Sequence, residues 1–438
     1  MKIEITSSVP TTEFFWVILL GLRNEIREYS SMFRDVFSNR NILVISLTTS
    51  LYSLVAQGYR PFWTIYLKDF LGATYTNIGI FSMISTAENL LFQLPGGMLA
   101  DKYGRRKIIL LGTFIRTFSP VLYFLAPSWE WVIPAAIVSG MTSLYMPAFN
   151  AIIADSLPSK RRGAGYGAYN TLTSLPQIVS PFVGGIIMEK YGYYQGVRMF
   201  LLLQIGVSLL TTVIRYYTIK ETMVHESGRR PSTKITRQTF RELPRQIVVM
   251  MVVSIIASFS GRLVMDFTSL YALEVINITP VQLGFINMIV GVISAALALP
   301  GGMLSDRYGR KNNIMVSRVV SPVTQYMFTI ATGFESYAVI RAFNSVGLAF
   351  GGGGLATGGP SWNALIADIV PPEKRATVNG IMGTLTAVVG APSSVLGGWL
   401  WQTYYPQLPF QVSMVIGLFA AAIFWLGVKE PEKQALEM

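Results

Sequence analysis

Long apolar stretches separated by short polar segments recur along the chain and predict membrane-spanning helices. A helix needs about 20 apolar residues to cross the ~30 Å hydrocarbon core of a bilayer. Backbone polar groups in lipid must be satisfied within their own segment, so we expect α-helices and not alternating β-barrel strands. The twelve predicted spans are residues 42–66, 76–100, 107–126, 131–155, 164–188, 197–217, 246–271, 280–304, 313–332, 336–368, 376–402 and 409–428.

The composition agrees with a membrane protein. Charged residues are only 13% and hydrophobic residues 51% of the 438 residues, whereas soluble domains carry about 25% charged residues. The net charge of +12 comes from lysines and arginines concentrated in every second loop, at residues 102–107, 160–162, 220–245, 307–311 and 374–375. Because basic loops stay in the cytoplasm, we expect a multi-pass protein of the cell membrane with both termini cytoplasmic and with no nucleic-acid partner.

Several classes of chemistry are excluded by the residues that the chain lacks. It has no cysteine and a single histidine, His225. Thiolate nucleophiles, disulfides and metal sites built from cysteine or several histidines are therefore ruled out. The phosphate-binding loop of an ATPase is also missing from the sequence. We expect neither an enzyme nor a bound cofactor or metal.

The segments outside the spans suggest how the chain is organised. The apolar run at residues 14–22 is too short to cross a bilayer, and we interpret residues 13–38 as an amphipathic helix on the cytoplasmic surface. A disordered first dozen residues is the alternative. The expected organisation is an N-terminal segment with this helix (1–40), a six-helix bundle (41–217), a cytoplasmic linker (218–245), a second six-helix bundle (246–428) and a cytoplasmic tail (429–438).

Internal repeats support two equivalent bundles. Residues 94–107 (LPGGMLADKYGRRK) and 299–312 (LPGGMLSDRYGRKN) are identical at ten of fourteen positions. The segment Asn-Ala-Ile-Ile-Ala-Asp at 150–155 returns as Asn-Ala-Leu-Ile-Ala-Asp at 363–368. Duplicated bundles usually place a substrate path at their interface near the bilayer midplane.

The repeated loop between spans 2 and 3, together with six plus six helices, resembles the major facilitator superfamily of secondary transporters over about residues 41–428. The resemblance implies an all-α integral membrane fold with twelve transmembrane helices in two pseudo-symmetric six-helix bundles. It also implies alternating access in a lipid bilayer, a small-molecule substrate and a monomer.

The charges of the repeated loop suggest a cytoplasmic latch. Arg105 needs a carboxylate partner, and Asp155 at the end of span 4 is the obvious candidate. The resemblance implies that Asp101 and Arg105 connect to the acidic end of span 4 and to the start of span 11. The alternative is that these charges only anchor loops at the headgroups. The expected latch residues are Gly97, Asp101, Gly104, Arg105, Asp155, Asp306, Arg310 and Asp368.

Span 5 resembles the glycine-rich antiporter motif of drug/proton exporters. Ser180 stands where that motif has a glycine, and Ala136 stands where many such exporters carry an arginine on span 4. Glycine and proline are frequent in membrane helices because they allow close packing, which is the alternative explanation. The residues of the antiporter-like motif are Gly167, Ser180, Pro181, Gly184 and Gly185.

Charged residues at membrane depth are the main candidates for mechanism, because each costs at least ~2.5 kcal/mol to insert. Glu88 and Arg116 lie at similar depth, so we expect either a structural ion pair or a proton site. Asp266 and Arg262 share one face of span 7. The candidates for proton coupling are Glu88 and Asp266, and those for the substrate cavity are Arg60, Arg116, Arg262, Arg318 and Trp362.

Span 10 is too long for one straight helix. Residues 336–368 would extend about 50 Å at 1.5 Å per residue, well beyond the hydrocarbon core. We expect a break facing the central cavity, because glycine and proline are the poorest helix formers. A straight helix with a long extension is the alternative. The predicted hinge is Gly351, Gly352, Gly353 and Gly354.

These observations favour a secondary active transporter working by alternating access. The leading hypothesis is proton-coupled efflux of small, partly apolar compounds, because of the span 5 motif. The alternative is transport of organic or phosphorylated anions, because arginines outnumber acids at depth. A membrane sensor or scaffold without transport is a third hypothesis, although nothing in the sequence resembles an appended signalling domain.

Overall fold

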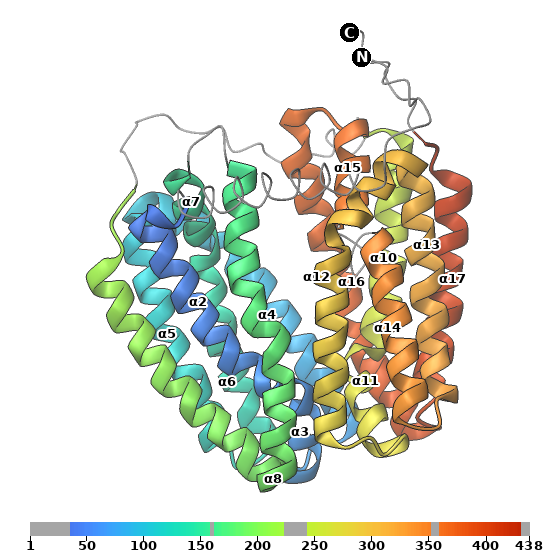
Figure 1. The fold of residues 1–438 in the computed structure, drawn as a ribbon, viewed down its shortest axis with the longest axis horizontal. Coiled ribbons are helices and arrows are strands. Elements are labelled where there is room, and N and C mark those ends of the chain that lie inside the picture. The colour runs from blue at the N-terminus through green and yellow to red at the C-terminus, as the bar shows by residue number, and fades with distance from the viewer. Residues whose placement is uncertain (1–35, 158–161, 223–242, 352–358, 431–438) are drawn as a thin grey trace, which may run out of the picture.

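The computed structural model describes residues 36–157, 162–222, 243–351 and 359–430. Within these ranges the regular elements are helices, arranged as two bundles side by side (Figure 1). Most of the predicted amphipathic helix at 13–38 lies outside the described residues, as do residues 223–242 of the linker and 431–438 of the tail.

The first bundle contains spans 1 to 6. Gly192 has a φ of 78°, in the left-handed region that favours glycine, and it divides the long helix α8 into spans 5 and 6. The elements of this bundle are α2 (Arg40–Tyr59), η1 (Arg60–Phe62), α3 (Trp63–Leu71), α4 (Tyr75–Tyr103), α5 (Arg105–Leu125), η2 (Trp129–Trp131), α6 (Val132–Met141), η3 (Thr142–Tyr145), α7 (Met146–Ser156) and α8 (Arg162–Thr218).

The second bundle contains spans 7 to 12. Its elements are α10 (Arg245–Met265), α11 (Phe267–Leu270), the π-helical turn η5 (Tyr271–Val275), α12 (Pro280–Tyr308), α13 (Arg310–Met327), η6 (Phe328–Ile330), α14 (Phe334–Gly351), α15 (Pro360–Ile369), α16 (Pro372–Thr403) and α17 (Leu408–Gly427). The two bundles together confirm the twelve predicted spans. In the described chain, eight helical segments are long and apolar enough to cross a membrane by length and composition alone.

The repeated loop has the same backbone in both bundles. Gly104 ends α4 with a φ of 92°, and Gly309 ends α12 with a φ of 94°. A side chain is strained in this left-handed region, so glycine is required for the tight turn into the next helix. We call the end of the molecule that carries these two turns the basic end, and the end near α3 and α11 the far end (Figure 1).

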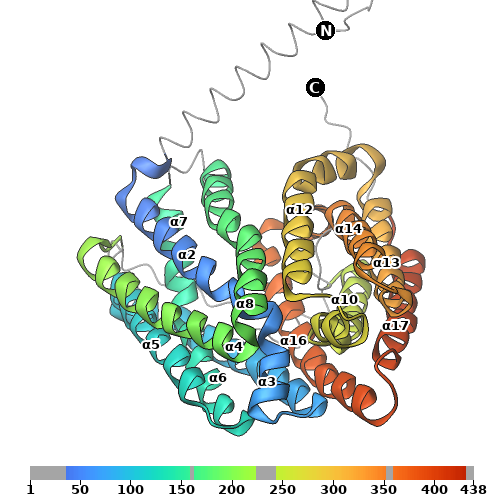
Figure 2. The same cartoon turned by 60° about the horizontal axis from the view of Figure 1, so that its bottom comes forward.

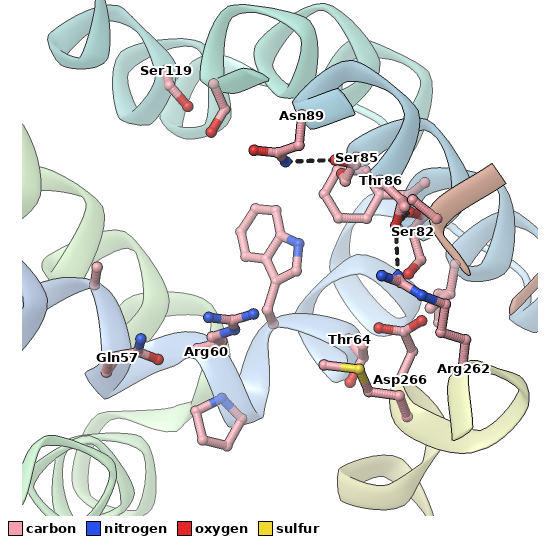
Figure 3. A pocket seen from close by; sticks show the side chains of 18 of the residues that line it. Gln57, Arg60, Thr64, Ser82, Ser85, Thr86, Asn89, Ser119, Arg262 and Asp266 are labelled. Carbon is pink, nitrogen blue, oxygen red and sulfur yellow. Dashed lines mark hydrogen bonds between the residues drawn. The ribbon is translucent and has the colours of Figure 1, made fainter. Parts of the chain in front are cut away.

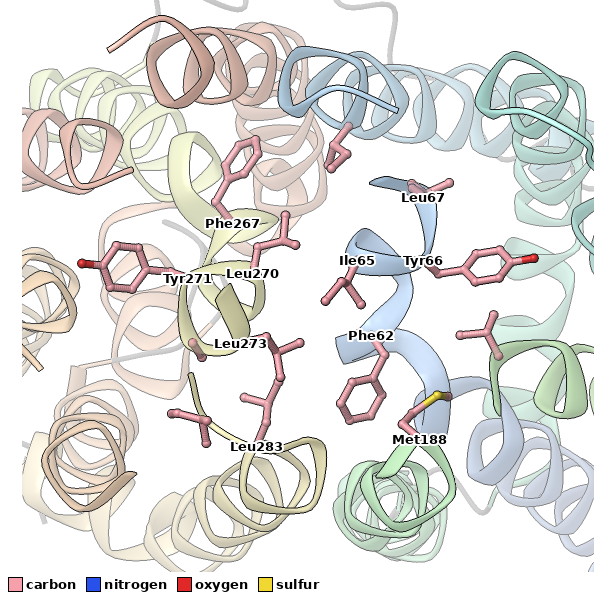
Figure 4. Packing of buried hydrophobic residues seen from close by; sticks show 14 of the residues in the cluster. Phe62, Ile65, Tyr66, Leu67, Met188, Phe267, Leu270, Tyr271, Leu273 and Leu283 are labelled. Atoms are coloured by element: carbon pink, nitrogen blue, oxygen red, sulfur yellow. The ribbon is translucent and has the colours of Figure 1, made fainter. Parts of the chain in front are cut away.

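Among the described residues, buried apolar side chains join the two bundles at the far end. One cluster spans both halves, with Phe62 and Ile65 of the first bundle facing Leu270 and Leu273 of the second (Figure 4). A second cluster around Ile152 belongs to the first bundle alone. A third, around residues 362–366, belongs to the second bundle alone. In the part of the chain that the structure describes, apolar burial therefore holds the halves together at the far end.

Two close helix crossings, of α4 with α16 and of α8 with α12, reinforce this seal. A Cβ atom added at Gly79 would collide with the backbone of α16, and one at Gly185 with the backbone of α12. Gly398 and Gly284 provide the reciprocal contacts. Small residues at such crossings let helix backbones approach closely in a membrane. Figure 2, with the far end turned forward, shows α4 beside α16.

Span 10 is not one continuous helix. Helix α14 runs to Gly351, where the described residues stop, and α15 begins at Pro360. Gly359 has an extended backbone with φ −77° and ψ 163°, which excludes unbroken helical hydrogen bonding from Gly347 to Asn363. Gly352, Gly353 and Gly354 lie outside the described residues. Their role as a hinge stays a prediction.

Candidate functional site

A cavity of about 1220 Å³ lies between the two bundles. Its walls come from α2, η1, α3, α4, α5, α6 and α8 on one side and from α10, α11, α12 and α16 on the other. The shared apolar cluster closes it at the far end, while lining residues such as Gln93 and Asn379 are exposed. The cavity is therefore accessible from the basic end.

The lining of the cavity is rich in residues with polar side chains. More than half of its residues carry an amide or a hydroxyl group, for example Gln57, Ser85, Asn89, Asn287 and Thr384. Such groups supply hydrogen-bond donors and acceptors from both halves. A bound molecule rich in polar atoms would therefore find partners on both sides.

Among the described residues, three charged side chains line the cavity. Arg60 belongs to η1 of the first half, while Arg262 and Asp266 lie one turn apart on span 7 of the second half (Figure 3). Ser82 and the charges of Arg262 and Arg60 act on the Asp266 carboxyl group. Arg262 Nη1 donates to Thr86 Oγ1 at 2.8 Å. Arg60, Arg262 and Asp266, three of the candidates named from the sequence, therefore line the same cavity, and their functional roles stay predictions.

An aromatic wall lies on the first-half side of the cavity. It is formed by Tyr59, Trp63, Phe81 and Tyr123, all of which line the cavity. The Trp63 ring centre lies 5.0 Å from that of Tyr123 and 6.3 Å from that of Phe81. Edge-on and tilted rings of this kind suit a planar or apolar group. Hydropathy does not reveal which side of a helix faces a cavity, so the position of Trp63 in this wall comes from the structure.

Arg116 and Arg318 do not line the central cavity, contrary to the sequence-based expectation. Arg116 is buried inside the first bundle, where it donates to Tyr145 Oη at 3.0 Å and stacks 3.7 Å from the ring centre of Tyr52. Arg318 occupies the equivalent place in the second bundle, 4.9 Å from the ring of Trp362. Trp362 is itself 1% exposed and packs in the core of that bundle. The cavity role expected for these three residues is therefore wrong.

Glu88 and Arg116 do not form an ion pair among the described residues, which was one of the two alternatives drawn from the sequence. The Glu88 side chain packs against Gly140 and is 6% exposed. Its Oε2 atom has no hydrogen-bond partner within the described part of the chain. Similar depth was not sufficient for pairing, because the two side chains point to different neighbours.

The ion pairs expected at the basic end are present. Arg105 pairs with Asp155, and Arg310 pairs with Asp368. Each pair lies within one half and does not bridge the halves. Asp101 is exposed and forms no hydrogen bond or ion pair with a described residue. The side chain of Asp306 is outside the described part, so the latch as a whole stays a prediction.

Two carboxylates at the basic end were missed by sequence reasoning. Glu221 accepts from the backbone of Arg106 at 2.9 Å, and Glu430 accepts from the backbone of Arg310 at 2.6 Å. Both lie at helix N-termini, where a negative charge is favourable. In the sequence, each of these glutamates directly follows a lysine just after the end of span 6 or span 12. This repeated Lys-Glu dipeptide is the signal that could have identified both carboxylates.

Polar bridges between the halves at the far end were also missed. Glu274 of η5 accepts from Lys68 Nζ at 2.8 Å and from Tyr75 Oη at 2.8 Å. Glu189 of α8 accepts from the backbone of Val281 at 3.1 Å. These contacts connect residues about 90 to 200 positions apart in sequence, so hydropathy gives no signal for them.

The antiporter-like motif holds α8 between two other helices. Gly184 lies against the backbone carbonyl of Gly58 in α2, while Gly185 lies against that of Pro280 in the other half. Ser180 donates to the Leu54 carbonyl. Gly184 and Gly185 of the motif therefore form part of the far-end crossing. Gly167, the first residue of the motif, has open space beside it and takes no part in this contact.

Comparison with known proteins agrees with this architecture. A profile described as Major Facilitator Superfamily matches residues 45–393 and 250–437. An uncharacterized MFS-type transporter of Methanocaldococcus jannaschii is 24% identical over 395 residues, which are 89% of this chain and 98% of that protein. Multidrug resistance protein 2 of Bacillus subtilis is 24% identical over 331 residues, or 74% of this chain and 80% of that one. The crystal structure of the nucleoside transporter NupG superposes with a TM-score of 0.69 at 15% identity, covering 89% of this chain and 99% of that one.

Proposed function

The chain belongs to the Major Facilitator Superfamily of membrane transporters, and from this premise we propose that it moves a small organic compound by alternating access, with proton coupling at Asp266. The cavity between the halves carries this proposal. It is large enough for a small molecule, sealed at one end and accessible from the other. Rocking of one half against the other would expose the same site to the opposite side.

We further propose that the basic end faces the cytoplasm of the cell and that the described state is inward-open. The basic loops around residues 102–107 and 307–311 support this orientation through the positive-inside rule. Each chain has its own complete cavity between its halves, which supports a monomer as the working unit.

Asp266 is the proposed proton site because it is the acidic residue among the described lining residues of the cavity. A carboxyl group within the substrate site can link protonation to cargo binding. Glu88 is the second candidate, because its buried carboxyl group has an oxygen without a partner among the described residues.

Two classes of cargo are candidates. The name of the Bacillus subtilis relative and the aromatic wall favour export of partly apolar compounds. The excess of arginine over acid in the lining favours organic or phosphorylated anions.

The test is a flux measurement on purified protein in liposomes. A pH gradient is imposed, and cationic dyes are compared with organic anions for uptake and for exchange. Accumulation that follows the pH gradient is the expected result. If neither class of compound shows gradient-driven flux or exchange, the proposed function is contradicted.

A further inference from the structure

We propose that the cargo is an organic anion with an aromatic or apolar body, whose anionic group binds at Arg60 while a proton binds at Asp266. This inference rests on the proposed transport function and names the charge of the cargo. Its basis is a difference in partners: Arg262 and Asp266 interact with neighbouring polar or charged groups, whereas Arg60 has no hydrogen bond or ion pair among the described residues.

Arg60 is the positively charged residue of the cavity whose side chain is available to bind a ligand. Its side chain is exposed to the cavity and forms no hydrogen bond or ion pair with any described residue. A guanidinium group in a fixed position presents a fork of N–H donors that matches carboxylate and phosphate. Gln57, one helical turn earlier, lines the same wall and offers an amide donor (Figure 3).

The other two charges already have partners. Arg262 donates to Thr86, and its charge acts on Asp266 of the same helix. Asp266 also faces the Ser82 hydroxyl of α4. The second half of the site is therefore close to neutral, and the positive excess of the cavity is located at Arg60.

The surroundings of Arg60 indicate the body of the cargo. Tyr59 and Trp63 flank Arg60 in the sequence and line the cavity with it. Their rings lie 5.8 Å apart in an edge-on arrangement. A molecule whose anionic group reaches Arg60 would bring its adjoining part against these rings, which favours an aromatic or apolar group there.

Asp266 couples this site to protons. Arg60 from η1 and Arg262 from α10 are the charged residues that act on its carboxyl group. An ionised Asp266 repels an incoming anion and competes for the same arginines. A protonated Asp266 does neither, so proton and anion each strengthen the binding of the other. A cationic cargo would have the opposite relation and would compete with the proton.

The experiment uses three probes of the same shape and different charge: benzoate, benzamide and benzylammonium. Their binding to the purified full-length protein in detergent is measured by calorimetry over a pH series. We expect benzoate to bind tighter than the other two by about tenfold or more. Its affinity should rise by several-fold as the pH falls, because a nearby negative charge is removed.

Variants assign the effect to residues. Arg60→Gln should weaken benzoate binding by about tenfold, and Arg60→Lys should restore part of the loss. Asp266→Asn should bind benzoate tightly with little pH dependence. The control is Arg198→Gln, because Arg198 donates to the Phe124 carbonyl at 3.0 Å and does not line the cavity; it should bind like the original protein.

Several results would overturn the inference: equal benzoate binding by Arg60→Gln, tighter binding of benzylammonium, affinity that rises with pH, or no benzoate binding at millimolar concentration. These results are separable from failure of the proposed function. Benzoate binding that depends on Arg60, without flux of any compound in liposomes, would contradict transport and leave the anion site standing.

Discussion

Asp266 and Glu88 are both carboxyl groups at membrane depth, and their neighbours give them different chemistry. Asp266 lines the central cavity and lies within the field of two guanidinium groups. Glu88 packs against Gly140 outside the lining of that cavity. A proton on Asp266 changes the field at a residue that lines the cavity, whereas Glu88 does not line the cavity itself and packs against α6.

We predict that Asp266→Asn uncouples transport from protons. The amide keeps the shape of the side chain and cannot release a proton, so accumulation driven by a pH gradient should be lost while exchange of cargo continues. Both fluxes are measured in liposomes at equal internal and external pH and under a gradient. Glu88→Gln is the matched comparison and should retain coupling. Normal gradient-driven accumulation by Asp266→Asn would exclude this residue as the coupling site.

At the scale of elements, hydropathy and the internal repeats were sufficient to predict the twelve spans. They also predicted the Arg105–Asp155 and Arg310–Asp368 pairs, because a loop motif and a helix end recur together. They did not predict which residues meet inside a bundle. The rise per residue gives the depth of Arg116, but its direction around α5 depends on packing against α2 and η3.

The same limit explains the misplaced Trp362. Tryptophan at this depth in the membrane suited a cavity wall. In the structure, however, the Trp362 side chain of α15 points into the core of the second bundle and packs against Phe424. Helices in this protein face lipid, protein and cavity on different sides, so their hydrophobic periodicity is a poor guide to direction.

The crossing of α8 with α12 gives a prediction about one element. Gly185→Leu places a side chain against the backbone at Pro280, so the far end should separate and transport should fall by about tenfold or more. Spin labels at Asp69 and Asn277, both exposed at that end, report the separation by pulsed electron resonance. Gly167→Leu is the control on the same helix, because open space lies beside Gly167. An unchanged distance distribution in Gly185→Leu would contradict the role of this crossing.

The loop at the basic end gives a second prediction. Asp101 has no partner among the described residues in this open state. If the latch closes onto the start of α16 in the opposite state, Asp101→Asn removes a contact of that state alone. The inward-open population should then increase, with shorter label distances at the far end and longer ones at the basic end. Equal distributions in Asp101→Asn and in the original protein would count against the latch.

For the whole molecule, the balance between the two ends decides which way the cavity faces. The shared apolar cluster and the bridges around Glu274 hold the far end closed. No described core cluster crosses between the halves at the basic end. A state of this kind can change only if the far-end contacts are replaced by new contacts at the other end.

We predict that Glu274→Gln shifts this balance toward the opposite state. The side chains of Lys68 and Glu274 are 30% and 19% exposed, so the loss of their pair should change the populations by about fivefold, equivalent to ~1 kcal/mol. The chain has no cysteine, so Ser85→Cys provides a single reporter in the cavity. Its reaction with an impermeant maleimide from the far side should accelerate several-fold. Glu130→Gln, an exposed acid at the same end, is the control and should leave the rate unchanged.

The charges lining the cavity also determine what a membrane potential can do. With Asp266 ionised, Arg60, Arg262 and Asp266 leave the empty site with one positive charge. A proton and a monovalent anion that bind together add no net charge to the site. The loaded site therefore moves one positive charge across the membrane in one direction, and the empty site moves the same charge back in the other. A potential of 100 mV does about 2.3 kcal/mol of work on each such charge, but this work cancels over a complete cycle. We therefore expect a potassium diffusion potential set by valinomycin to alter the rate of anion uptake and not its final accumulation, whereas a pH gradient of one unit should set that accumulation at about tenfold. Accumulation that follows the potential would mean that proton and anion do not travel as a pair.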